Sequence, residues 1–189
     1  MLRTKSIILA PLMISLGVGA VSAADLIIPT TPEPIYEAAP SGFDWNGLYV
    51  GIEGGGQFAG ETNGVVGAVA GFNFMVSDSA LAGVELQGDY VWNGDDFDAT
   101  EFLASGRVGA IVTDSVLAYA KAGVGYRDPS NDGNAEGAMY AFGGGLEVAT
   151  TEAMSVRGEV LGQGFFGDDA PNDGGFTAAK ATVGVLFHF

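Results

Sequence analysis

Apolar and polar positions alternate along most of the chain from Gly47 onward. In the first such stretch, Leu48 and Ile52 share one face, whereas Glu53 and Gln57 share the other. A period of two places successive side chains on opposite faces, which is typical of a β-strand with one apolar and one polar face. The same alternation recurs in six later stretches, and one further stretch, 65–74, is apolar on both faces.

The pattern predicts eight strands of about ten residues, the length at which a tilted strand crosses a bilayer. The predicted strands are 47–58, 65–74, 82–92, 102–112, 116–124, 140–148, 154–163 and 179–189. Short connections at 76–80, 113–115 and 150–153 alternate with longer ones at 59–63, 93–100, 127–136 and 167–175. Short turns on one side and longer loops on the other are typical of outer-membrane barrels. The sequence therefore predicts an all-β fold, an eight-stranded antiparallel transmembrane β-barrel over residues 47–189.

The first 46 residues contain two other kinds of segment. Arg3 and Lys5 precede a mostly apolar run from Ile7 to Val21, which is shorter than a membrane-spanning helix requires. This is the pattern of a secretory signal peptide, expected over residues 1–23. Four prolines follow within 29–40, and proline-rich chain is extended and cannot join the middle of a sheet. We expect a flexible Pro-rich lead-in over 24–46.

The distribution of charge indicates which face of the strands points inward. Removal of Arg3 and Lys5 with the signal peptide leaves five basic residues, of which four lie on the polar faces of strands and Arg127 lies in a predicted loop. A narrow lumen needs its charges paired, whereas a soluble surface would also carry Lys and Arg in its loops. The polar faces should therefore line the lumen, and the apolar faces should meet lipid. The predicted lumenal charge network is Glu53, Glu85, Asp89, Arg107, Lys121, Glu147, Arg157, Glu159 and Lys180.

The alternation also predicts specific neighbours inside and outside the barrel wall. Charges on adjacent strands should pair, which gives Arg107 with Glu85 and Asp89, and Lys180 with Glu159 and Glu53. Tyr49 and Tyr119 should fill the lumen, and Tyr90, Trp92 and Tyr126 should form an outer aromatic girdle near the loops. An eight-stranded barrel is barely wide enough for its own side chains. The inward charges therefore predict a plug of salt bridges, with a small pore as the alternative.

Three stretches carry a resemblance to a known family. They are Ala24-Asp25-Leu26 followed by the segment 43–51 (FDWNGLYVG), the segment 155–159 (SVRGE) and the C-terminal segment 183–189 (VGVLFHF). The chain resembles the small outer-membrane β-barrel proteins of Gram-negative bacteria, the OmpA-like and opacity-like surface antigens, in particular their alphaproteobacterial branch. The resemblance implies a location in the cell outer membrane. It also implies outer-membrane lipid, lipopolysaccharide and the assembly machinery as partners, with Phe187 and Phe189 as the assembly signal.

The composition excludes several kinds of catalytic and binding site. The chain has a net charge of −16 and no Cys, which excludes cysteine nucleophiles and thiolate metal sites and makes nucleic acid an unfavourable partner. The resemblance extends to barrel enzymes that use His near the extracellular rim, but His188 is the single histidine and lies at the predicted periplasmic edge. We therefore expect no enzymatic activity, no cofactor and no dedicated metal site.

The predicted loops are acidic, and this suggests what the surface could do. Their ten acidic residues are Glu61, Asp95, Asp96, Asp98, Asp128, Asp132, Glu136, Asp168, Asp169 and Asp173. Clustered carboxylates could bind divalent cations, although a solvated, repulsive face is the simpler interpretation. The predicted function is a structural surface protein that supports envelope integrity and presents acidic loops. A small porin-like channel and an adhesin-like binding module are the alternatives.

Overall fold

The computed structural model describes residues 42–94, 96–129, 137–166 and 175–189. The predicted signal peptide and most of the predicted lead-in lie outside these ranges. The described chain forms eight strands. They are β1 (Gly47–Phe58), β2 (Thr62–Ser77), β3 (Ala80–Asn93), β4 (Asp96–Thr113), β5 (Val116–Pro129), β6 (Gly137–Ala149), β7 (Met154–Phe165) and β8 (Ala178–His188).

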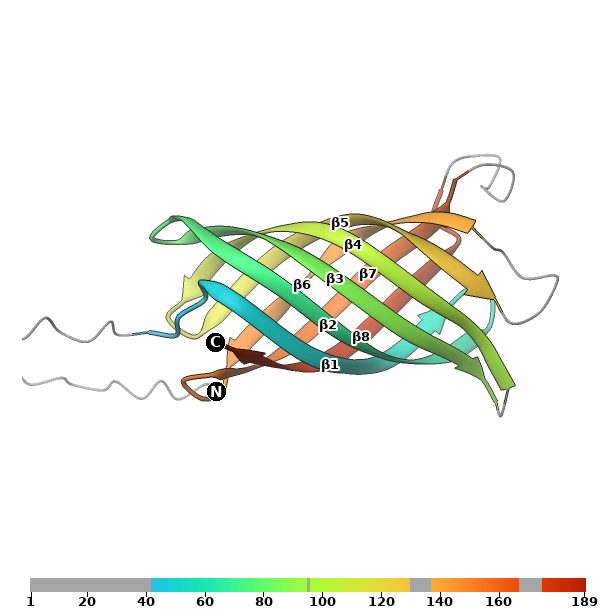
Figure 1. The fold of residues 1–189 in the computed structure, drawn as a ribbon, viewed down its shortest axis with the longest axis horizontal. Coiled ribbons are helices and arrows are strands. Elements are labelled where there is room, and N and C mark those ends of the chain that lie inside the picture. Colours follow the sequence, from blue (N-terminus) through green and yellow to red (C-terminus); the bar gives the residue numbers. More distant parts are fainter. Residues whose placement is uncertain (1–41, 95, 130–136, 167–174) are drawn as a thin grey trace, which may run out of the picture. The chain divides into compact units, whose positions relative to one another are not determined.

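The eight strands form one closed antiparallel barrel, as Figure 1 shows. Each strand pairs with its neighbours in the sequence, and β8 pairs with β1 to close the wall. Closure satisfies the backbone hydrogen-bonding groups of every strand without a free edge, which a sheet inside a bilayer requires. The predicted eight-stranded antiparallel barrel is confirmed.

Two of the four connections that the sequence pattern predicts to be long are short turns. The predicted loop 93–100 is a tight turn, since Asn93 already pairs with Asp96 across the β3–β4 ladder. The predicted loop 59–63 is reduced to residues 59–61 between β1 and β2. The prediction of four long loops is therefore wrong at these two places. Backbone pairing continues where the apolar alternation stops, because ladder hydrogen bonds do not depend on side-chain polarity.

This extension of the strands also changes the predicted acidic loops. The backbone of Asp96, Asp98 and Asp128 belongs to β4 and β5. Glu61 lies in the β1–β2 turn, exposed, where it accepts a hydrogen bond from Asn93 at 3.0 Å. The other six predicted loop acids, Asp95, Asp132, Glu136, Asp168, Asp169 and Asp173, lie outside the described residues.

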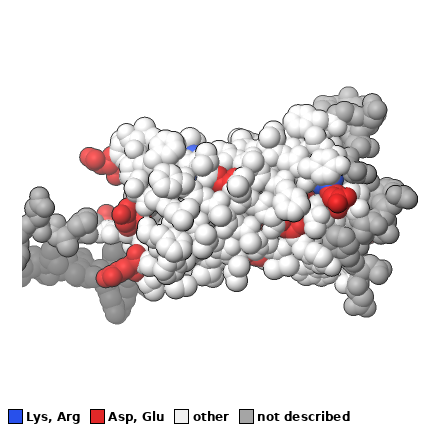
Figure 2. Space-filling model, in the orientation of Figure 1, with Lys and Arg blue, Asp and Glu red and all other residues white. Residues whose placement is uncertain are grey.

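The barrel is apolar outside and polar inside. Large apolar side chains such as Ile52, Phe102 and Val183 are each more than 60% exposed, whereas charged side chains fill the interior. Figure 2 shows the result, a side wall that is largely uncharged. Acidic side chains gather at the end that carries the β2–β3, β4–β5 and β6–β7 turns, which we call the short-turn end. This is the reverse of a soluble barrel, and it requires a lipid environment around the wall. The stretch 65–74 is apolar on both faces because it departs from this rule: Val66 and Phe72 are exposed outside, and Val65 and Val69 are buried in the lumen.

Residues 42–46 fold into the short-turn end of the barrel. Trp45 is 1% exposed and packs against Leu81 and Leu117 in the lumen. Its carbonyl oxygen accepts a hydrogen bond from the Asn73 amide at 3.0 Å. The prediction of a flexible lead-in is therefore wrong for these residues, because burial of a large aromatic side chain holds them in place.

Candidate functional site

All nine side chains of the predicted charge network are buried in the lumen, none more than 5% exposed. Six of them form one group near the short-turn end, which we call the inner network: Glu85, Glu147, Glu159, Arg107, Lys121 and Arg157. Arg157 lies 2.7 Å from a Glu85 oxygen and 3.2 Å from a Glu147 oxygen. Lys121 lies 2.6 Å from Glu85 and 2.9 Å from a Glu159 oxygen. Three cations thus neutralise three carboxylates across the lumen.

Two tyrosines complete the inner network. The Tyr49 hydroxyl donates to Glu85, and the Tyr119 hydroxyl donates to Glu159, each at 2.6 Å. The Arg107 guanidinium lies 4.6 Å from the centre of the Tyr49 ring and 5.1 Å from that of Tyr119. The Tyr49 ring depends on Gly71, where an added Cβ would lie 2.2 Å from the hydroxyl oxygen. The predicted inward placement of both tyrosines is thus what the structure shows.

A second group lies nearer the loop end, which we call the outer network: Asp89, Glu101, Arg127 and Lys180. Lys180 hydrogen-bonds Asp89 and lies 3.7 Å from Glu101, and Arg127 lies 2.8 Å from Glu101. Gln57 and Gln163 tie this group together through hydrogen bonds to Glu101 of 2.7 and 2.9 Å. The sequence pattern missed Glu101 and Arg127, because both lie beyond the ends of the predicted strands.

The prediction that Arg127 lies in a loop is wrong. It lies in β5, is 9% exposed and pairs with Glu101 inside the lumen. All five basic residues of the chain after Lys5 are therefore inside the barrel.

The predicted partners inside the lumen were also wrong. Arg107 contacts Glu147 and the Asn73 side chain rather than Glu85 and Asp89. Lys180 contacts Asp89 and Glu101 rather than Glu159 and Glu53. Long side chains in a narrow lumen reach across it, so sequence neighbours in the wall are not the nearest charges.

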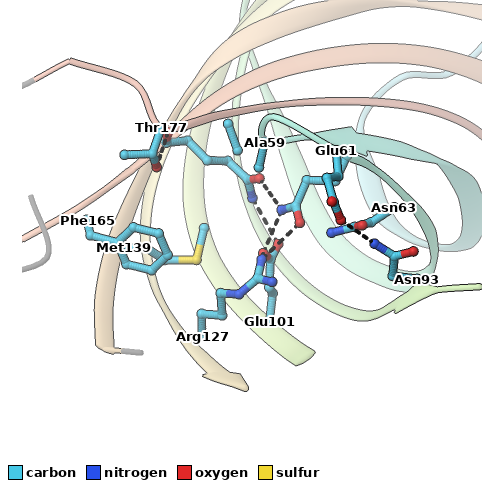
Figure 3. Close-up of a pocket in the computed structure, with 12 residues that line it drawn as sticks. Ala59, Glu61, Asn63, Asn93, Glu101, Arg127, Met139, Phe165 and Thr177 are labelled. Atoms are coloured by element: carbon cyan, nitrogen blue, oxygen red, sulfur yellow. Dashed lines mark hydrogen bonds and ion pairs between the residues drawn. The ribbon is translucent and has the colours of Figure 1, made fainter. Parts of the chain in front are cut away.

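The loop end of the lumen opens into a cavity of about 370 Å³, shown in Figure 3. Gln57, Glu101, Arg127 and Gln163 contribute its polar lining, and their hydrogen bonds are drawn in the figure. Figure 3 labels Glu101 and Arg127 of these four, and the further lining residues Ala59, Glu61, Asn63, Asn93, Met139, Phe165 and Thr177. The cavity ends on the hydrogen-bonded outer network, so the outer network separates it from the inner network.

His188 lies at the opposite end of the lumen. Its Nε2 atom is 3.0 Å from both Ser155 Oγ and a Glu147 oxygen, and the Ser155 hydroxyl donates to the same Glu147 oxygen at 2.6 Å. A Ser–His–acid relay uses the two ring nitrogens separately, whereas here one nitrogen faces both partners. The rings of Phe43 and Trp45 pack against His188, with centroids 4.8 and 5.9 Å away. This cluster therefore has the geometry of a packed seal rather than of a nucleophilic relay.

The predicted assembly residues and girdle lie on the outer wall. Phe187 and Phe189 are 43% and 71% exposed, with ring centroids 5.0 Å apart. Tyr90 and Tyr126 are also exposed, and the Tyr90 and Trp92 rings are 6.2 Å apart. Aromatic side chains thus lie at both ends of the apolar wall.

The described residues contain neither a metal centre nor a membrane-spanning helix. Across 42–94, 96–129, 137–166 and 175–189, no three His, Cys, Asp or Glu side chains are arranged to hold a metal ion. Within the same ranges, no helix is both long and apolar enough to cross a bilayer.

Comparisons with known proteins identify the fold. No family model and no curated protein matches the sequence. Among solved structures, the chain is similar to the N-terminal β-barrel domain of Pseudomonas aeruginosa OprF, with 19% identity, a TM-score of 0.50, and 75% of this chain and 97% of that chain covered. It is also similar to Ail, the attachment invasion locus protein of Yersinia pestis, with 13% identity, a TM-score of 0.53, and coverage of 76% and 99%.

The closed barrel, its apolar outer wall and its charged lumen define the class of this protein. It is a small transmembrane β-barrel of the outer-membrane type. Its place is in the outer membrane of a Gram-negative cell, where the lipid that the wall requires is available.

Proposed function

We propose that the protein is a structural component of the outer membrane that contributes to envelope integrity and does not conduct ions. The observation that carries this proposal is the inner network. Its six side chains, each at most 2% exposed, join β3, β4, β5, β6 and β7 across the lumen. An ion would have to displace several charge-assisted hydrogen bonds at once to pass this layer.

The short-turn end adds a second barrier. Trp45 fills the lumen beneath the inner network, with Phe43 and His188 packed around it. An eight-stranded barrel leaves little room beyond its own side chains. The porin-like alternative would need both the inner network and this aromatic layer to open.

The outer surface supports a role in presenting acidic loops. Every basic residue after Lys5 lies inside the barrel, so the outer surface of residues 42–189 carries no Lys or Arg. Contact with the phosphates of lipopolysaccharide would then require bridging divalent cations. Ail is described as an attachment invasion locus protein. An adhesin-like role is the alternative here, and surface attachment that loop deletion abolishes without harming assembly would support it.

Planar-bilayer recording tests the proposal. The wild-type protein is expected to give no steady current steps, because both barriers are closed. Arg157→Ala, which removes the cation that bridges Glu85 and Glu147, should give intermittent leak currents. Glu152→Gln, an exposed change in a short turn, is the matched control and should behave as wild type. Steady wild-type steps of uniform size would replace the structural proposal with the porin-like one.

A deletion strain tests the contribution to the envelope. Loss of the protein should increase cell sensitivity to detergent, and the wild-type gene should restore resistance. Unchanged sensitivity would contradict the envelope-integrity part of the proposal.

A further inference from the structure

Buried Asp and Glu side chains outnumber buried Lys and Arg side chains by one in the described lumen, and the buried His188 lies apart from this count, against Glu147 at the short-turn end. The buried acids among the described residues are Glu53, Glu85, Asp89, Glu101, Glu147 and Glu159, and the buried Lys and Arg side chains are Arg107, Lys121, Arg127, Arg157 and Lys180. The inner network is balanced at three and three, and the outer network at two and two. Glu53 belongs to neither, and its one hydrogen bond in the described structure comes from the neutral Gln87 amide at 2.7 Å. A buried carboxylate without a countercharge is costly.

The neighbouring Asp89 has an oxygen without a partner. Its Oδ2 atom accepts hydrogen bonds from Lys180 and from Gln87, but its buried Oδ1 atom accepts none. The Asp89 side chain is 1% exposed. A buried carboxylate oxygen without a donor is a place where a positive charge would be stabilised.

The register places Glu53 and Asp89 at the same level of the lumen, on the two sides of β2. Gly67 on β2 pairs with Glu53 on one side and with Asp89 on the other. The glycine leaves a gap in the lumen wall, and Asp89 Oδ1 occupies it, 2.0 Å from where a Cβ on Gly67 would lie. The Gln87 amide nitrogen donates to both carboxylates, at 2.7 Å to Glu53 and 2.9 Å to Asp89. The two acids are thus held together with one net charge unmatched.

The surrounding charges do not supply the missing cation. The charged groups with the largest effect on Glu53 are Asp89 on β3, Lys121 on β5, Glu159 on β7 and Lys180 on β8. Lys121 is bound to Glu85 and Glu159, and Lys180 is bound to Asp89. Both lysines therefore already neutralise other carboxylates.

We propose that Glu53 and Asp89 form a binding site for one small monovalent cation, either a proton or an alkali ion such as Na⁺. One excess charge calls for one monovalent cation. A divalent ion at the same place would reverse the sign of the imbalance and leave a buried positive charge without a partner. The cavity at the loop end provides the approach, since Glu101 lines it and lies 3.7 Å from the Lys180 amine that binds Asp89.

Urea unfolding of the protein, purified from outer membranes and transferred to phosphatidylcholine vesicles, tests the site. In one series Na⁺ replaces N-methylglucamine at constant ionic strength and pH. In the other, without Na⁺, the pH falls from about 9 to about 6, a range in which a proton held only by the folded state raises stability. A cation bound only by the folded protein raises the folded-to-unfolded ratio by up to about tenfold for each tenfold rise in Na⁺ or each unit fall in pH.

Glu53→Gln keeps the shape and the Gln87 hydrogen bond but removes the excess charge. It should abolish the Na⁺ dependence if the cation is sodium, or the pH dependence if it is a proton, whereas Glu152→Gln should keep the wild-type response. If Glu53→Gln does not fold, Asp89→Asn removes the same charge and is judged by the same criterion. Equal responses of wild type and variant in both series would overturn the proposal.

Discussion

Arg157 shows how single residues hold the lumen closed. Its guanidinium contacts Glu85 and Glu147 at the same time, and it also lies 5.4 Å from the Tyr49 ring centre. Arg127, by contrast, lies at the cavity with 11% of its side chain exposed, where water can replace part of its contacts. The two arginines should therefore contribute differently to the free energy of unfolding, although both lie inside the barrel.

We expect Arg157→Ala to lower the free energy of unfolding by about 3–5 kcal/mol, because it removes the cation that Glu85 and Glu147 share and leaves only Lys121 and Arg107 to neutralise three buried carboxylates. Arg127→Ala should cost less, about 1–2 kcal/mol, because its site reaches solvent. Urea unfolding in vesicles, followed by tryptophan fluorescence, measures both. Equal losses would show that depth in the lumen does not set the cost.

At the scale of elements, the segment before β1 acts as part of the barrel core. Phe43 donates its backbone N–H to the Asp114 carbonyl at 3.1 Å, which ties the segment to the β4–β5 turn. Trp45 then reaches the lumen and packs on β3 and β5 through Leu81 and Leu117. A five-residue stretch without regular secondary structure thus closes one end of an eight-stranded sheet.

The chain has two tryptophans, which offer a matched comparison. Trp45→Ala should lower the free energy of unfolding by about 3–5 kcal/mol, as expected for a fully buried large aromatic side chain. Trp92→Ala, at a half-buried position near the loop end, should cost distinctly less. Circular dichroism during urea titration reports both without depending on the mutated fluorophore. A larger loss for Trp92→Ala would contradict the role assigned to Trp45.

At the scale of the whole molecule, closure depends on the β1–β8 seam. The seam pairs Tyr49 with His188 at one end and Phe58 with Ala179 at the other. Phe189 extends it by one hydrogen bond, from its N–H to the Leu48 carbonyl at 3.0 Å. The last residue therefore contributes both to the seam and to the exposed aromatic surface beside Phe187.

Deletion of Phe189 should reduce the amount of folded protein in the outer membrane severalfold, while purified protein still folds in detergent. The reason is that a single seam hydrogen bond contributes about 1 kcal/mol, whereas loss of an assembly signal acts before folding. Membrane fractionation followed by gel electrophoresis with and without heating measures the yield. Phe189→Tyr is the control and should retain it. A normal yield of the deletion would argue against an assembly signal at this end.

Much of the fold follows from the sequence, because a period of two forces alternate side chains to opposite faces of the wall. That constraint is enough to place the nine charged residues of the predicted network, and both inward tyrosines, on the lumenal face. The same constraint did not place residues at the strand ends. Glu101 and Arg127 lie where the apolar alternation stops although the backbone ladder continues.

The sequence by itself determined the barrel, its two faces and the lumenal side for the nine charges of the predicted network. Only the tertiary structure decided which charges meet, because that depends on the stagger between strands and on the reach of long side chains across the lumen. Neither can be read from alternation within one strand. The burial of Trp45 and the gap over Gly67 also depend on the tertiary structure. Each involves residues from several strands, which only the folded barrel brings together.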